Sequence, residues 1–107
     1  MIVFISGKIT DDPTYRSKFA DAETVISNLG HDVINPVILP DGIEYETYMR
    51  VCFALIDAAD TVVLLPDWCN SDGAQRERDY AFERKKPVRS YNSFVKAELE
   101  RTRKDRK

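Results

Sequence analysis

The sequence predicts an α/β domain in which a doubly wound parallel sheet of about four strands is flanked by helices. Two observations support this fold class. Short apolar runs typical of buried strands alternate with amphipathic segments of helical length along the chain. Each connection between successive strands is also long enough to contain a helix, as parallel strands require. Rossmann- and flavodoxin-like folds are built in this way.

The first half of the chain supplies two strands and two helices. Residues 2–6 form a continuous apolar strand. A helix is predicted over 13–30, because a proline opens it, Asp11 or Asp12 caps it, and a glycine follows apolar residues spaced three and four apart. Residues 32–35 form a second strand that a proline stops. Apolar side chains at helical spacing then predict a helix over 45–59.

The second half repeats the alternation. Residues 61–65 form the third strand, residues 73–84 the third helix and residues 87–90 the fourth strand. We therefore expect one α/β domain over 1–91, followed by a charged helical tail over 92–107 whose end frays.

Composition limits the classes of function. The chain has 107 residues, of which 43% are hydrophobic and 32% charged, so we expect an ordinary globular domain. A net charge of −2 argues against a general binder of nucleic-acid polymers, which needs a positive field. No apolar stretch approaches membrane-spanning length, so no membrane partner is expected.

Cysteine and histidine content favours a metal-free, cytoplasmic protein. Cys52 and Cys69 are isolated in the sequence, which suits a reducing cytoplasm. His31 is the only histidine, which excludes a histidine-rich zinc site. We expect no metal and no cofactor.

The first candidate ligand loop follows the first strand. It reads Ser6-Gly7-Lys8-Ile9-Thr10 and matches neither a P-loop nor the dinucleotide-binding glycine pattern. Gly7 still permits a tight turn, and Ser6, Lys8 and Thr10 are suitable donors to a phosphate or sugar. An ordinary β–α turn is an equally good interpretation.

The second candidate is Glu77, on the helix after the third strand. At 100° per residue, Gly73, Ala74 and Ala81 fall on the same side as Glu77, so the acid belongs to the small, apolar face expected to lie against the sheet. A carboxylate held there, near free backbone N–H groups, is a candidate nucleophile or base. A partly buried glutamate that stabilises its own helix is the alternative.

Residues around these loops complete the candidate site. Ser71 or Asp72 should cap the third helix, and Asp72 with Gln75 resembles a capping box. Ser71 would in addition form an anion pocket at the helix start. Trp68 either stacks on a nucleobase or covers the sheet edge. Asn35 ends the second strand and is expected to shape the pocket wall.

Several motifs occur together in a revealing order: F-I-S-G-K-I-T, G-H-D-V-I-N-P, Y-M-R, A-D-T-V-V-L-L-P-D-W and S-D-G-A-Q-R-E-R-D-Y-A. This pattern resembles the nucleoside 2-deoxyribosyltransferase-like superfamily. It is most similar to a small, often phage-encoded branch of unknown function. The likeness extends from the first strand to Val88.

The resemblance implies specific roles. Glu77 matches the glutamate that attacks the anomeric carbon of a deoxyribosyl group and releases the base. Ser71, six residues earlier, matches the serine that holds the 5′-phosphate in N-glycosidases acting on deoxynucleoside monophosphates. Ser6, Gly7, Lys8 and Ile9 match the loop that wraps the sugar-phosphate. Relatives complete their sites across a dimer.

The chain departs from the family pattern at three positions. Cys52 stands eight residues before Asp60, where an aspartate that helps to protonate or position the base is common. A thiol is a poor substitute for that carboxyl group. Phe4 replaces a frequent tyrosine, and Lys8 replaces a proline.

Two hypotheses of different class follow. The first is an N-glycosidase or deoxyribosyltransferase acting on a 2′-deoxynucleoside or its 5′-monophosphate. The second is a non-catalytic domain that senses or sequesters a nucleotide in the same cleft, and a purely structural module is a third possibility. We also expect a homodimer or higher homo-oligomer, because Phe82 points away from the predicted core face.

Overall fold

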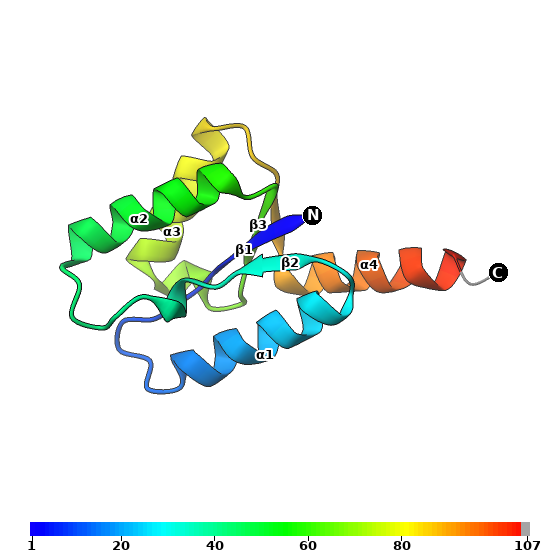
Figure 1. Ribbon diagram of the computed structural model, residues 1–107, viewed down its shortest axis with the longest axis horizontal. Coiled ribbons are helices and arrows are strands. Elements are labelled where there is room, and N and C mark those ends of the chain that lie inside the picture. The colour runs from blue at the N-terminus through cyan, green and yellow to red at the C-terminus, as the bar shows by residue number, and fades with distance from the viewer. Residues whose placement is uncertain (106–107) are drawn as a thin grey trace.

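The computed structural model describes residues 1–105 and has the predicted α/β fold (Figure 1). Along the chain lie β1 (Ile2–Ser6), α1 (Tyr15–Asn28), β2 (Asp32–Ile34), the 3-10 turn η1 (Pro36–Ile38), α2 (Tyr45–Ala58), β3 (Thr61–Leu64), the 3-10 turn η2 (Trp68–Asn70), α3 (Asp72–Glu83), β4 (Val88–Ser90) and α4 (Tyr91–Asp105). Every predicted helix and strand exists. Their bounds agree with the expectation to within two residues at all ends inside the described part of the chain.

The four strands pair in parallel, in the order β2-β1-β3-β4. The order reverses direction between β1 and β3, because the chain first adds β2 on one side of β1 and then β3 on the other. In sheets of this kind, ligands bind at the carboxyl ends of the two strands that flank such a switch point.

Two helices cover each face of the sheet (Figure 1). Because side chains alternate along a strand, Val3 and Ile5 of β1 pack on one face, in a cluster with Phe19 of α1 and Phe94 of α4. Phe4 faces the other side, in a cluster with Cys52 and Ile56 of α2 and Ala81 of α3. Ser6 therefore belongs to the α2–α3 face.

The first helix begins later than the sequence indicated. Pro13 lies in a turn, and α1 starts at Tyr15. Asp12 accepts hydrogen bonds from the backbone N–H and the hydroxyl of Thr14, at 2.9 and 2.8 Å. The aspartate therefore stabilises the turn that precedes the helix rather than capping the helix itself.

The C-terminal helix α4 packs against the sheet through Phe94, which is buried. Glu98, one turn further on, bonds His31 at 2.5 Å and Arg101 at 2.7 Å. These contacts fix α4 to the end of the α1–β2 connection. The last two residues of the predicted tail, 106–107, lie outside the described part.

Across residues 1–105, no helix is long and apolar enough to cross a membrane. The same part of the chain contains no group of three or more histidine, cysteine, aspartate or glutamate side chains able to hold a metal ion.

Candidate functional site

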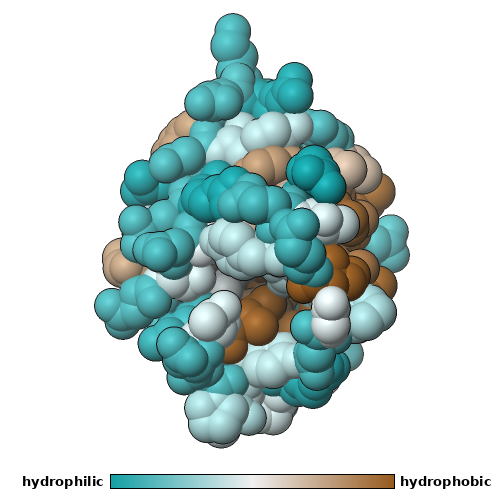
Figure 2. Space-filling model, turned by 90° about the vertical axis from the view of Figure 1, so that its left-hand side faces the viewer, coloured by the Kyte–Doolittle hydropathy of each residue, from teal (hydrophilic) through white to brown (hydrophobic). Residues whose placement is uncertain are grey.

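A cavity of about 560 Å³ opens at the carboxyl ends of β1 and β3, beside the switch point of the sheet. Figure 2 shows the face of the molecule with this opening, where apolar side chains lie in a hollow surrounded by hydrophilic ones. The loops after β1, β2 and β3 and the first turns of α2 and α3 form its wall. The fold therefore places a pocket where parallel α/β sheets bind ligands.

Glu77 is the acid of this cavity. It lies on the face of α3 that carries Ala74 and Ala81, and all three residues are buried, as the helical periodicity predicted. Glu77 is 4% exposed and contributes to the cavity wall. The small neighbours allow α3 to approach the sheet closely, so the carboxylate reaches the end of β1.

Ser6, the last residue of β1, holds that carboxylate. Its hydroxyl donates a 2.6 Å hydrogen bond to Oε1 of Glu77, and the serine is fully buried. The alternation of β1 places Ser6 on the face that α3 covers. Ser6 thus orients the Glu77 carboxylate from the end of β1 and does not itself line the cavity.

Burial raises the pKa of Glu77 from its ordinary value of 4.5 to about 7. The Ser6 hydroxyl, the Cys52 thiol and the Arg76 charge favour the ionised form and partly offset the burial. Cys52 is itself buried, and burial together with the nearby Glu77 raises the pKa of its thiol, which keeps it neutral. The site therefore contains an acid that changes charge near neutral pH.

Ser71 lies at the start of α3, beside Glu77. It is the helix N-cap, and its Oγ accepts a 3.1 Å hydrogen bond from the backbone N–H of Ala74. The alternative capping box is not formed, since Gln75 donates instead to the backbone carbonyl of Cys69. Ser71 and Gly73 both line the cavity, as expected.

The first loop supplies Gly7, Lys8 and Ile9 to the cavity wall. A side chain at Gly7 would approach the buried side chain of Leu65 to 2.9–3.2 Å, so glycine is needed where this loop crosses the end of β3. The backbone N–H of Lys8 donates to Asp67 at 3.0 Å, which joins the loop after β1 to the loop after β3.

The ammonium of Lys18 strengthens that junction. It donates to the backbone carbonyl of Lys8 at 2.8 Å and to Asp12 at 2.5 Å, and it also bonds Asp67. One cation on α1 therefore connects both ligand loops.

Two further candidate residues, Trp68 and Asn35, lie beside the cavity rather than in its wall. Trp68 begins the turn η2 and packs on the α2–α3 side of the core, with Arg78 over its ring at 4.9 Å. Asn35 caps the turn η1 through Val37 and donates to Glu23 at 2.9 Å. Neither residue lines the cavity. Both stabilise the connections that border it.

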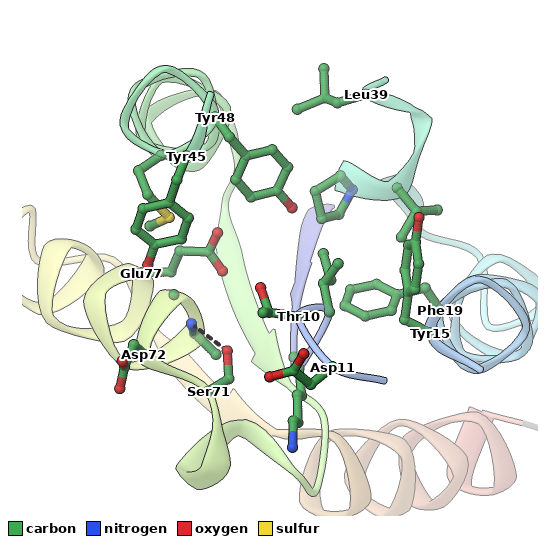
Figure 3. A pocket seen from close by; sticks show the side chains of 18 of the residues that line it. Thr10, Asp11, Tyr15, Phe19, Leu39, Tyr45, Tyr48, Ser71, Asp72 and Glu77 are labelled. Carbon is green, nitrogen blue, oxygen red and sulfur yellow. Dashed lines mark hydrogen bonds between the residues drawn. The ribbon is translucent and has the colours of Figure 1, made fainter. Parts of the chain in front are cut away.

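The sequence did not single out the apolar wall of the cavity. This wall is formed by Ile9, Phe19, Pro36, Val37, Leu39, Ile43, Tyr45, Tyr48 and Met49. In Figure 3, Phe19 and Leu39 lie opposite Tyr48 and Glu77, with Ser71 and Asp72 at the base of the view. The run of apolar residues between β2 and α2 was a usable signal, because a segment outside regular structure rarely carries so many apolar side chains without covering something.

The charges of the cavity are mainly acidic. Asp11, Asp41, Asp72 and Glu77 line it together with Lys8. Asp41 is held by the hydroxyl of Tyr15 at 2.6 Å and by Arg16 at 2.7 Å. The cavity therefore combines acidic and hydroxyl groups with an apolar wall.

Fold and site together define a small parallel α/β domain with a buried acid in a ligand-sized pocket. The chain belongs to the family described as Domain of unknown function (DUF4406), whose model matches residues 1–90. No curated protein matches the chain. The family match ends at the last residue of β4, so it covers the sheet and every residue of the cavity.

Proposed function

We propose that this protein cleaves the N-glycosidic bond of a 2′-deoxynucleoside or its 5′-monophosphate, with Glu77 as the nucleophile. One observation carries the proposal: a buried carboxylate, held by Ser6, lies in a cavity of about 560 Å³ at the switch point of the sheet. The resemblance of its motifs to the nucleoside 2-deoxyribosyltransferase-like superfamily supports the same assignment. In that resemblance, Glu77 matches the superfamily's nucleophile.

The chemistry runs in two displacements. An oxygen of ionised Glu77 forms a bond to C1′ of the sugar, while the bond from C1′ to the base breaks and its electron pair leaves with the base, which takes a proton from water. Water then attacks C1′, loses a proton to solvent and releases Glu77 as a carboxylate. If a second base attacks instead of water, the same intermediate gives transfer.

Two features suit this reaction. Positive charge develops on the sugar ring in the transition state, and a nearby carboxylate stabilises it most strongly where water is excluded. A pKa near 7 for Glu77, raised by burial, leaves a useful fraction ionised at neutral pH and retains nucleophilicity.

Ser71 and the start of α3 are the proposed contacts for the 5′ end of the ligand. The backbone N–H groups at a helix start favour negative charge, and Ser71 adds a hydroxyl beside them. Lys8 supplies the positive charge of the cavity wall. The apolar wall then remains for the nucleobase.

Cys52 supports a second candidate function, a non-catalytic nucleotide-binding domain. Its thiol is buried and neutral where related enzymes commonly have a carboxyl group. A site without that carboxyl group can still bind the ligand. It lacks a carboxyl group that would help to protonate the base.

Release of free base separates the two functions. The protein is incubated with each of the common 2′-deoxynucleosides and their 5′-monophosphates, and free base is measured by chromatography. We expect release from at least one substrate and none from Glu77→Gln, which retains the shape of the side chain and an acceptor for Ser6. Binding of the same compounds to both proteins without any release would establish the non-catalytic function and exclude the enzyme.

We also propose self-association as a homodimer or higher oligomer. Phe82 on α3 is 61% exposed, so it is available for a contact between copies of the chain. Light scattering of the protein and of Phe82→Ser tests this. A monomeric wild-type protein at high concentration would exclude it.

A further inference from the structure

The hydroxyl of Tyr48 is a buried polar group of the cavity that the proposed function does not use. Tyr48 lies in the first turns of α2 and lines the cavity. Its hydroxyl oxygen is enclosed, and within residues 1–105 it meets no group in full hydrogen-bond geometry; only the Cys52 thiol, a weak partner, interacts with it. A buried hydroxyl without a partner costs about 1–3 kcal/mol, so proteins rarely retain one without a use.

Three other hydroxyl groups in or beside the cavity are hydrogen-bonded within the protein. Ser6 donates to Glu77 at 2.6 Å, and Ser71 accepts from the backbone of Ala74 at 3.1 Å. The hydroxyl of Tyr15 donates to Asp41 at 2.6 Å. The Tyr48 hydroxyl differs from these three hydroxyls because it meets no partner in full hydrogen-bond geometry. This difference indicates that it binds a ligand that enters the cavity.

The orientation of Tyr48 indicates what it would contact. In Figure 3 its ring descends from α2 and its hydroxyl points into the middle of the cavity, between Glu77 on one side and the wall of Phe19 and Leu39 on the other. A sugar carbon that faces Glu77 and a base that packs on the apolar wall would place the bond between them beside this hydroxyl.

The phenol is suited to donate rather than to ionise. Burial raises its pKa above the ordinary value of 10, and the neighbouring Cys52 and Glu77 raise it further. Its raised pKa therefore keeps the phenol protonated at neutral pH.

We propose that Tyr48 donates a hydrogen bond to the nucleobase, at the acceptor atom bonded to the ring carbon next to the glycosidic nitrogen. That atom is O2 in a pyrimidine and N3 in a purine. The inference rests on the proposed function and adds a residue that contacts the substrate. As the C1′–N bond breaks, its electron pair moves onto the base and the acceptor gains negative charge, so the hydrogen bond strengthens in the transition state. Tyr48 keeps its proton throughout, and water supplies the proton that the base takes up.

A double cycle between protein and substrate tests the contact. Tyr48→Phe removes the hydroxyl alone, and a 3-deaza purine deoxynucleoside removes the N3 acceptor alone. For a pyrimidine, a 2-thio analogue replaces O2 by a weaker acceptor. We expect Tyr48→Phe to lower kcat/KM by roughly 10- to 100-fold on the parent substrate and by less than about 3-fold on the analogue.

Tyr80→Phe is the matched control. Tyr80 lies on α3, and its hydroxyl donates to Asp57 at 2.6 Å on the outer surface, away from the cavity. We expect unchanged kcat/KM for this variant on both compounds. The urea midpoint of Tyr48→Phe should equal or exceed that of the wild type, because the lost hydroxyl has no partner in full hydrogen-bond geometry in the protein.

The outcomes separate this inference from the proposed function. If Tyr48→Phe leaves base release unchanged, or lowers it equally on the parent substrate and the analogue, the proposed contact of Tyr48 is wrong. The proposed glycosidic cleavage by Glu77 is then unaffected. If the wild type releases no base, the same cycle is measured as Kd. Coupling in Kd then supports the Tyr48 contact in a binding protein, and absence of coupling or of binding overturns it.

Discussion

Ser6 and Glu77 are 71 positions apart in the sequence and are joined by a hydrogen bond of 2.6 Å. The bond links the end of β1 to the inner face of α3. It fixes the orientation of the acid relative to the sheet, and it is one of the contacts that favour the ionised form of Glu77. Several measurable properties depend on this pair.

The activity should rise with pH up to neutrality. Glu77 must be ionised to attack, and burial raises its pKa to about 7, so kcat/KM should increase tenfold per pH unit below that value and level off above it. Ser6→Ala removes a hydrogen bond that favours the carboxylate, so the rise should move to higher pH. Initial rates of base release from pH 5 to 9 give the pH profile of the wild type and of Ser6→Ala. An identical pH profile for the two proteins would contradict the role of the Ser6–Glu77 hydrogen bond.

The stability of the protein should fall over the same range. The folded-state pKa of Glu77 is raised by burial from 4.5 to about 7, so folded protein holds the proton more tightly than unfolded protein does. Its contribution to stability is therefore complete below pH 4.5 and is lost as pH rises through 7. A rise of this pKa from 4.5 to about 7 corresponds to a change of roughly 3 kcal/mol in the free energy of unfolding.

Glu77→Gln removes this dependence. Compared with the wild type, we expect the variant to be more stable above pH 7 and similar near pH 4.5, as measured by urea unfolding across pH. Glu83→Gln, an exposed position on the same helix, is the control. A constant difference between Glu77→Gln and wild type at every pH would rule out the raised pKa.

A Ser71→Asp substitution should discriminate between phosphorylated and unphosphorylated substrates. Aspartate is as good an N-cap as serine, so α3 should keep its start and its stability. The added negative charge would repel a 5′-phosphate and leave a nucleoside little affected. The preference is measured as the ratio of kcat/KM for the monophosphate to kcat/KM for the nucleoside. We expect this ratio to fall at least 10-fold in the variant. An unchanged ratio would place the phosphate elsewhere.

Two glycines of the cavity should respond oppositely to alanine. A Cβ at Gly7 would lie 2.9–3.2 Å from the buried Leu65 side chain, so Gly7→Ala should cost about 1–3 kcal/mol. A Cβ at Gly73 meets its nearest atoms at 3.6 Å or more, and Gly73 lies within α3, so Gly73→Ala should gain up to about 1 kcal/mol. Thermal unfolding of Gly7→Ala and Gly73→Ala measures the two changes in stability. Equal effects would contradict the contact with Leu65.

The docking of α4 should depend on Glu98. This buried carboxylate bonds His31 and Arg101, so Glu98→Ala should cost about 1–3 kcal/mol at pH 7, whereas the exposed Glu100→Ala should cost almost nothing. The bonds to Arg101 and His31 lower the pKa of Glu98, so its contribution is complete above the ordinary carboxyl pKa and is lost as pH falls through the lowered value. Urea midpoints at neutral and acid pH measure the difference, and equal losses for the two variants would contradict it.

Much of the fold followed from patterns that act over a few residues. The strand spacing required parallel pairing, and the small residues around Glu77 identified the buried face of α3 before any contact was known. Gly7 and Ser71 were found for similar reasons, since a strand end and a helix start are local features. These features need no knowledge of the neighbouring elements.

The apolar wall of the cavity was harder to predict because it depends on tertiary packing. Residues 37–43 contain no helix or strand longer than a turn, so no periodicity assigns a direction to Leu39 or Ile43. The orientation of the Tyr48 hydroxyl depends on how α2 lies over α3. The choice between the two interpretations of Trp68 also depended on tertiary packing: the turn η2 directs it onto the core, where Arg78 lies over its ring.

The junction formed by Lys18, Asp12 and Asp67 has an evolutionary consequence. One side chain from α1 connects two loops that are 55 positions apart, so loss of Lys18 leaves two carboxylates close together without the cation that they share. Substitutions at these three positions should therefore be inherited together across the family. A relative with a neutral residue at position 18 is expected to carry neutral residues at 12 and 67 as well.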